Sequence, residues 1–177
     1  MVNDVLRPVD DTARTLAKRL LRTASRASLA TLEPQTGWPY GSLVTVATTL
    51  DGRPLLLVST LSLHTRALAA DPRCSLLLDE PGTGDPLAKP RLTIFGRAEF
   101  LDRESEPGVQ ARQRFLSRHP KASLYADFGD FSFVRIDPDR ALLNAGFGRA
   151  SELAAGDFVA PPDAGDEVAS RAAGDFI

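Results

Sequence analysis

The strongest local folding signal in this chain is the pair Asp51-Gly52, which lies between two runs of strand-like residues. Such a pair is typical of a β-hairpin, because Asp and Gly tolerate the positive φ values that a two-residue hairpin turn requires. The sequence therefore predicts two antiparallel strands, Tyr40–Thr49 and Pro54–Ser59, joined by a tight turn at these residues.

Residue periodicity predicts the other elements of the same unit. Helices show apolar residues at three- and four-residue intervals, and strands show short runs of β-branched or alternating apolar residues. The expected helices are Asp10–Ala24, Leu63–Ala70 and Pro107–Arg118, and the other expected strands are Ala27–Leu32, Cys74–Leu78, Leu92–Phe100, Phe131–Ile136 and Ala141–Ala145. A sheet of about six strands with few helices closes on itself, because closure removes its unpaired edges. The sequence therefore predicts a mainly β protein, a small antiparallel barrel with peripheral helices.

Length and composition favour one domain followed by a tail. The 177 residues fall within the range of a single domain, and the apolar (43%) and charged (25%) fractions are those of ordinary globular proteins. From residue 156 onward the chain consists mostly of Ala, Gly, Pro and acidic residues, which cannot build a core. We therefore expect residues 1–155 to form the folded domain and residues 156–177 to form a mobile tail.

Charge and residue counts argue against several partners and sites. The 21 basic and 23 acidic residues give a net charge of −2, whereas a nucleic-acid binder usually has a basic excess. No uncharged apolar run approaches the ~18 residues of a membrane span, and residues 1–25 lack a secretory signal, so we expect no membrane partner and a cytoplasmic location. Cys74 is the only cysteine, and His64 and His119 are the only histidines, so we expect no cysteine-based zinc or iron–sulfur site and no three-histidine metal centre.

The segment from Val58 to Arg66 runs off the end of an expected strand into the start of an expected helix. Such a junction gathers hydroxyl groups, free backbone N–H groups, the positive end of a helix and a guanidinium, which together suit a phosphate. The alternative is that Thr60 or Ser62 caps the helix and that Arg66 is a surface charge. On these residues alone the alternative is favoured, since helix caps are common and phosphate sites are few.

The familiar nucleotide and hydrolase motifs are incomplete or missing. The run GFGRAS at 146–151 is similar to a GxGxxG phosphate turn, but Ser151 stands at the third glycine. Only the acidic tail follows, which leaves no room for the strand and helix of a dinucleotide-binding unit. The sequence contains neither GxxxxGK[ST] nor GxSxG, so nothing favours a P-loop or an α/β-hydrolase mechanism.

A set of short motifs follows in a specific order along the chain. They are PYGSLV at 39–44, the Asp51-Gly52 hairpin, STLSLHTR at 59–66, DPRCSLL at 71–77 and RLTIFGRA at 91–98. In this order and spacing they resemble the FMN-binding split barrel of the pyridoxamine 5′-phosphate oxidase superfamily. RHP at 118–120, DF at 130–131 and GFGRA at 146–150 are similar to the branch that contains the haem-utilisation proteins. The resemblance covers residues 12–155.

The resemblance implies a fold, a cofactor and an assembly. Members have a six-stranded antiparallel split β-barrel of the FMN-binding type, and they form homodimers in which two FMN molecules lie at the subunit interface. The residues that match contacts along the flavin are Ser42, Leu43, Val44 and Thr45. The residues that match the ribityl phosphate site are Ser59, Thr60, His64, Thr65 and Arg66, with Arg91 as an additional basic residue.

Departures from the family pattern argue against vitamin B6 oxidation. Pyridoxamine phosphate oxidases have an Arg where this chain has Ser42, and an Arg-Lys pair where it has Thr65 and Arg66. They also end in Arg- and Trp-bearing segments, whereas the only Trp here is Trp38, in an early loop. We therefore expect an FMN-dependent oxidoreductase in which the flavin exchanges hydride with another small substrate. The alternative is a non-catalytic module that binds flavin or haem.

Arg149 and Phe147 are the candidates for the substrate side of the cofactor. Glycines at 146 and 148 flank Phe147 and allow backbone angles closed to other residues, so this turn can present both side chains to a neighbouring group. With the resemblance, we expect Arg149 to face the substrate side of the flavin and to pair with an anionic substrate or a haem propionate. The alternative is a plain chain reversal before a short helix at 151–155.

Overall fold

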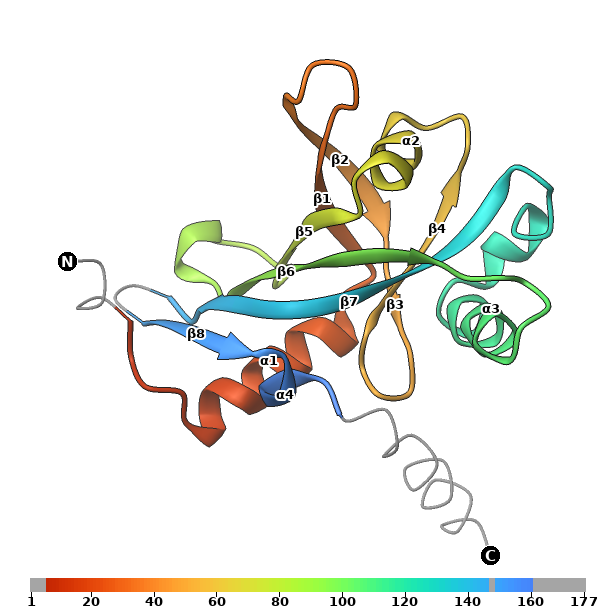
Figure 1. Cartoon of the computed structure of the whole chain (residues 1–177). Coiled ribbons are helices and arrows are strands. Elements are labelled where there is room, and N and C mark those ends of the chain that lie inside the picture. The colour runs from red at the N-terminus through yellow and green to blue at the C-terminus, as the bar shows by residue number, and fades with distance from the viewer. Residues whose placement is uncertain (1–5, 147–148, 161–177) are drawn as a thin grey trace, which may run out of the picture.

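The computed structural model describes residues 6–146 and 149–160, which form one curled antiparallel sheet with helices around it (Figure 1). The helices are α1 (Asp11–Thr23), α2 (Leu63–Ala70), α3 (Glu106–Arg118) and α4 (Ala155–Phe158), with short 3-10 helices η1 (Pro86–Ala88) and η2 (Pro120–Leu124). The strands are β1 (Arg26–Leu32), β2 (Pro39–Thr45), β3 (Ala47–Thr48), β4 (Pro54–Ser59), β5 (Arg73–Asp79), β6 (Arg91–Phe100), β7 (Phe131–Asn144) and β8 (Ala150–Ala154). The predicted class, mainly β with peripheral helices, is confirmed.

The hairpin predicted at Asp51-Gly52 is present, with a longer turn than expected. β3 and β4 pair antiparallel on either side of it, and Gly52 has a φ of 97°. Among the described residues only glycines have positive φ, so Asp51 is not in the conformation that a two-residue turn needs. Instead, the Thr49 N–H donates to the Arg53 carbonyl at 2.9 Å, and the turn spans residues 49–53.

The sheet closes because one segment of chain forms both of its ends. The hydrogen-bonded order is β2-β1-β5-β6-β7-β4-β3, with β8 added on β7. β2 ends at Thr45 and β3 begins at Ala47, so the two end strands are halves of one segment that bends at Val46. Val46 is buried, and its N–H donates to the Ser25 carbonyl at 3.0 Å. The structure therefore has eight strands where six were expected, because the bend divides one strand and β8 is added.

β7 is one continuous strand of 14 residues, although the sequence predicted two separate strands there. Its proline, Pro138, is tolerated because it lies opposite Gly96, where the register between β6 and β7 shifts. A Cβ atom on Gly96 would stand 2.5 Å from the Asp137 carbonyl oxygen, so this close approach of the two strands requires glycine. The irregularity bends β7 without ending it, which lets the strand pair with both β4 and β8.

The last described residues pack onto the barrel. The short helix offered as an alternative at 151–155 is wrong over most of its length, because β8 (Ala150–Ala154) pairs with β7 there. Residues 156–160 were assigned to the tail on composition, but Phe158 and Val159 are buried in the main core. The rest of the expected tail, residues 161–177, lies outside the described part of the chain.

Two apolar clusters organise the fold, and β4 lies between them. The main core fills the barrel and includes Leu56 and Val58, which point to the same side of β4. A smaller cluster lies beneath α3 and includes Leu55 together with Phe115 and Phe133, whose ring centroids are 5.8 Å apart. β4 therefore begins beside α3 and ends where the chain turns into α2 (Figure 1).

Candidate functional site

The predicted flavin contacts on β2 lie on two faces of the sheet. Val44 is buried on the inner face, and the Ser42 hydroxyl points to the same side because strand side chains alternate. Leu43 and Thr45 are exposed on the outer face, Leu43 to 69%. A flat ligand on one face of β2 cannot contact all of these side chains. Only the outer pair is accessible within one subunit.

The residues at the start of α2 also divide between core and surface. Thr65 is 5% exposed, whereas Arg66 is exposed on the neighbouring face of the helix. The Thr65 and Ser42 hydroxyls have no hydrogen-bond partner among the described residues. Both oxygens are closed off by protein atoms, so a phosphate group could not reach them unless α2 or β2 moved.

His64 lies at the boundary between these two groups. The residue is half-buried, and this burial lowers the pKa of its imidazole below the ordinary value of 6.5. At pH 7 the ring is therefore neutral. A neutral imidazole offers a nitrogen lone pair to a metal ion and no positive charge to a phosphate.

A carboxylate stands at the end of β4, where the family places a phosphate. The Ser59 hydroxyl donates to the Asp130 carboxylate at 2.8 Å, and the Thr60 N–H donates to the Asp130 carbonyl at 2.8 Å. The motif at 130–131 was visible in the sequence, but nothing in it assigned a partner to Asp130. This carboxylate lies 71 positions from Ser59 along the chain. This hydrogen bond occupies the Ser59 hydroxyl and places the negative charge of Asp130 beside it.

The described residues therefore do not fit the phosphate of FMN in the predicted way. A phosphate site needs free donors and positive charge. Here the Ser59 hydroxyl is already bonded to Asp130, the Thr65 hydroxyl is closed off, and His64 is neutral. Arg66 is the one predicted residue of this group that carries a full positive charge at the surface.

Two of the predicted basic residues lie at the far end of the sheet. Arg91 begins β6, where it is opposite Asn144, and Asn144 is in turn opposite Ala150, next to Arg149. The Arg91 guanidinium donates to the Leu87 carbonyl at 3.0 Å. Arg149 is exposed and immediately precedes β8, a strand that lies far from α2 in Figure 1. One subunit does not bring this pair together with His64, and Phe147 lies outside the described residues.

Leu61 just after β4, and Leu124 and Phe128 before β7, are three exposed apolar residues, named the apolar rim. Leu61 is 83% exposed, Leu124 76% and Phe128 59%, which is unusual for large apolar side chains. The segments that carry Leu61 and Phe128 are joined by the hydrogen bond from the Thr60 N–H to the Asp130 carbonyl. Sequence reasoning missed this rim, because the loop before β7 has no periodic pattern.

Arg103 fixes the shape of the loop that carries most of the apolar rim. One terminal nitrogen of its guanidinium donates to the carbonyls of Ala126 (3.0 Å), Phe128 (2.7 Å) and Phe131. Charged donors to backbone carbonyls are among the stronger hydrogen bonds in proteins. The exposed side chains of the rim are therefore presented by an ordered backbone.

The described residues gather no three His, Cys, Asp or Glu side chains that could hold a metal ion. None of the helices in the described part of the chain is long and apolar enough to cross a membrane.

Comparisons with known proteins identify a family and several relatives of this chain. The profile of the family described as "CREG, beta-barrel" matches residues 8–160. The chain is 41% identical over 125 residues to the non-canonical heme oxygenase HOZ of Arabidopsis thaliana chloroplasts, an alignment that covers 69% of this chain. It is 28% identical over 134 residues to the heme oxygenase HutZ of Vibrio cholerae, covering 74% of this chain and 75% of HutZ.

A solved structure is also similar to this chain over most of its length. A heme binding protein from Mycobacterium smegmatis superposes with a TM-score of 0.77 at 32% identity, covering 86% of this chain and 61% of that one. The alignment with HOZ covers only 36% of that protein. The chain thus spans about a third of its plant relative, so what the remainder of HOZ contributes has no counterpart in the alignment.

Proposed function

Since the chain belongs to the CREG β-barrel family, within the FMN-binding split-barrel superfamily and close to its haem-utilisation branch, we propose that it binds haem. This was the alternative that the sequence left open, and the comparisons support it better than the FMN-dependent oxidoreductase expected first. The relatives that are named for haem make haem binding the first hypothesis to test. The residues that would contact the haem lie at the end of β4 and the start of α2.

The observation that carries the proposal is the half-buried neutral imidazole of His64, which follows the apolar rim residue Leu61 by three positions. Haem binding needs an axial ligand and apolar contacts for the porphyrin. His64 would supply the ligand nitrogen, and Leu61 and Phe128 would supply apolar contact. Arg66, exposed two residues after His64, would pair with a propionate. When bound, haem supplies the redox-active iron.

A titration of hemin into the purified protein tests this proposal. We expect a Soret band that saturates at one haem per chain, and no saturable change in the flavin spectrum when FMN is titrated instead. In His64→Ala we expect the loss of the ligand to shift the Soret band and to weaken haem affinity at least tenfold.

The matched control is His119→Gln. His119 Nε2 lies 2.8 Å from the Val46 carbonyl at the bend between β2 and β3, and a glutamine amide can make the same bond. This variant should keep the wild-type haem spectrum. The proposal is overturned if FMN binds stoichiometrically and haem does not. If His64→Ala keeps the wild-type spectrum and affinity, His64 is not the ligand.

We further propose that the protein is a homodimer that pairs through the outer face of the sheet. Leu43 and Leu77 lie in one row across β2, β1 and β5, both opposite Ser28, and they are 69% and 40% exposed. Exposed apolar side chains in a row on a sheet are typical of a self-association surface. Light scattering should give the mass of two chains for the wild type. A shift toward one chain is expected in Leu43→Asp, and a monomeric wild type would refute the proposal.

A further inference from the structure

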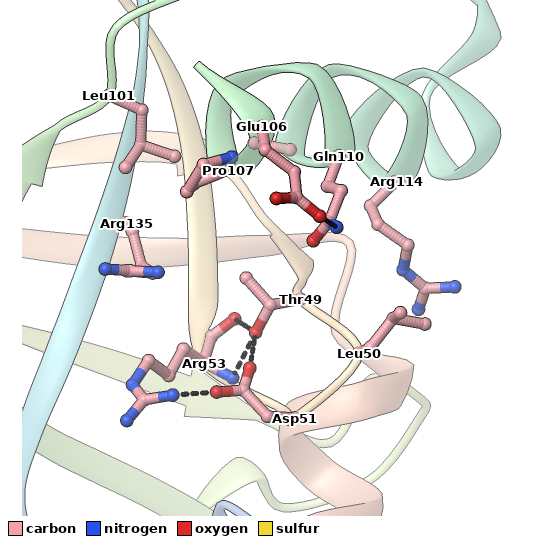
Figure 2. Close-up of a pocket in the computed structure, with 11 residues that line it drawn as sticks. Thr49, Leu50, Asp51, Arg53, Leu101, Glu106, Pro107, Gln110, Arg114 and Arg135 are labelled. Carbon is pink, nitrogen blue, oxygen red and sulfur yellow. Dashed lines mark hydrogen bonds and ion pairs between the residues drawn. The ribbon is translucent and has the colours of Figure 1, made fainter. Parts of the chain in front are cut away.

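A cavity of about 270 Å³ lies at the opposite end of β4 from His64, between the β3–β4 hairpin and the start of α3 (Figure 2). Its volume corresponds to that of about nine water molecules in the liquid, at ~30 Å³ each. Its back wall is apolar, with Leu101 and Ala111 of the smaller cluster and the ring of Pro107. Its sides carry three arginines, Arg53, Arg114 and Arg135, which give the cavity its chemistry.

Arg53 is neutralised by carboxylates. Its guanidinium pairs with Asp51 and, through Nε at 2.9 Å, with Asp137. Asp51 also accepts a hydrogen bond from the Thr49 hydroxyl, which in turn accepts one from the Arg53 N–H at 2.8 Å. Figure 2 shows this network as one wall of the cavity. This network gives the cavity a fixed polar wall, and the charge of Arg53 in it is balanced by carboxylates.

Arg135, on another side of the cavity, is also neutralised by a carboxylate. Its Nε and one terminal nitrogen both donate to the same carboxylate oxygen of Glu99, at 3.2 and 2.6 Å. Arg114 differs from both. Its Nε donates to the Thr48 carbonyl at 3.2 Å, and no carboxylate of a described residue lies within 4.0 Å of its guanidinium. The backbone contact orients the group and leaves its terminal N–H groups for the cavity.

We propose that this cavity binds a small monocarboxylate with a compact apolar body. The Arg114 guanidinium would pair with the carboxylate, and the wall of Leu101, Pro107 and Ala111 would take the apolar part. Arg114 is the one arginine of this cavity without a carboxylate partner among the described residues, and its guanidinium fork matches the planar geometry of a single carboxylate. Its Nε contact with Thr48 preorganises the fork, which lowers the entropy lost on binding.

Glu106 on the rim provides a second way to test the proposal. Its carboxylate accepts a hydrogen bond from the Gln110 amide at 3.2 Å, and both residues are exposed. Figure 2 places them along the same stripe of α3 as Arg114. A negative charge at the rim opposes the entry of an anion, so replacing Glu106 by Gln should strengthen binding. The same change should have little effect on a neutral ligand of the same shape.

The experiment compares benzoate with benzamide, which has nearly the same shape and no charge, by calorimetric titration of the full chain. We expect benzoate to bind and benzamide to bind at least tenfold more weakly. Arg114→Gln should weaken benzoate binding by about 10- to 100-fold, because a charged hydrogen-bond pair is lost. The matched control is Arg112→Gln, since Arg112 lies on the same helix but pairs with Asp127 away from the cavity.

Equal binding of benzoate and benzamide would overturn the proposal, as would equal losses in the Arg112 and Arg114 variants. Arg114→Lys keeps the charge without the fork, so it should retain part of the affinity and thereby separate loss of charge from loss of folding. Glu106→Gln should raise benzoate affinity about threefold and leave benzamide unchanged. Hemin titration of Arg114→Gln should match the wild type, because His64 lies at the other end of β4.

Discussion

The two ends of β4 present opposite chemistry on one short strand. At its end, the Ser59 hydroxyl is bonded to the Asp130 carboxylate, and Leu61 and Phe128, two positions from this pair along the chain, are exposed. At its beginning, Arg53 is neutralised, while Arg114 on the facing helix has no carboxylate partner among the described residues. The family places an anionic phosphate near the first end. In this chain the second end is better suited to an anion.

The comparison shows that pairing, rather than residue type, decides what a polar group can bind. Hydroxyl, imidazole and guanidinium groups at the end of β4 looked like a phosphate site when their types were counted. A hydrogen bond to a carboxylate, burial of an oxygen and a lowered imidazole pKa remove most of that capacity. At the beginning of β4 the decisive fact is also a pairing, since Arg114 alone of the three cavity arginines has no carboxylate partner among the described residues.

The largest expected effect comes from a glycine at the start of α3, where the helix meets the loop that precedes it. A Cβ atom on Gly108 would stand 1.9 Å from the Asp102 carbonyl oxygen, so Gly108→Ala must displace backbone. We expect a loss of about 3 kcal/mol in the free energy of unfolding. This corresponds to a melting temperature lower by about 6–12 °C. Displacing α3 should also weaken benzoate binding.

Gly129→Ala is the matched change at the other end of β4. A Cβ atom on Gly129 would meet no heavy atom within 4 Å, and its φ is not positive, so the variant should unfold within about 0.5 kcal/mol of the wild type. Denaturant unfolding of both variants checks the pair. Equal losses would mean that the two ends do not differ in how tightly the backbone packs.

A smaller effect is expected when the carboxylate at the end of β4 is neutralised. Asp130→Asn keeps an oxygen that can accept from the Ser59 hydroxyl, so we expect a loss of only about 1 kcal/mol in stability. Removing the negative charge should raise the affinity for inorganic phosphate by about 1 kcal/mol, or roughly fivefold. Phosphorus NMR titration of the variant and the wild type measures this directly.

Asp127→Asn is the control for Asp130→Asn, because Asp127 lies in the same loop and pairs with Arg112 at 2.6 Å instead of with Ser59. It changes the net charge equally and should leave phosphate affinity unchanged. If both variants gained affinity alike, the effect would be one of overall charge. The gain in phosphate affinity would then not come from the surroundings of Ser59 at the end of β4.

Much of the fold could be predicted because its signals are local. The Asp51-Gly52 turn and the alternation along the strands depend on neighbouring residues, and both were found. The bend at Val46 and the continuity of β7 through Pro138 could not be predicted. Each depends on a partner distant in sequence, Ser25 in one case and Gly96 in the other. A proline in a strand pattern argues for a break until the opposite bulge is known.

The site was less predictable for the same reason. The run at 59–66 does end a strand and begin a helix, as the sequence indicated. Which of its side chains face outward depends on how α2 packs, and this buries Thr65 while leaving Arg66 exposed. The bond from Ser59 to Asp130 joins two elements that only the folded sheet brings together. Motif order identified the family without revealing these pairings.

The smallest expected effect is the pH dependence that His64 adds at the end of β4. Burial lowers the pKa of this imidazole in the folded state below 6.5, so the unfolded chain binds the proton more readily. The contribution of His64 to stability is therefore complete above pH 6.5 and declines as the pH falls through the folded-state pKa. We expect His64→Gln to flatten the decline in stability between about pH 7 and pH 5. Denaturant unfolding of His64→Gln and of the wild type at a series of pH values measures this slope. An unchanged slope in His64→Gln would mean that His64 is not held neutral by burial, and the main support for a haem ligand at this end of β4 would be lost.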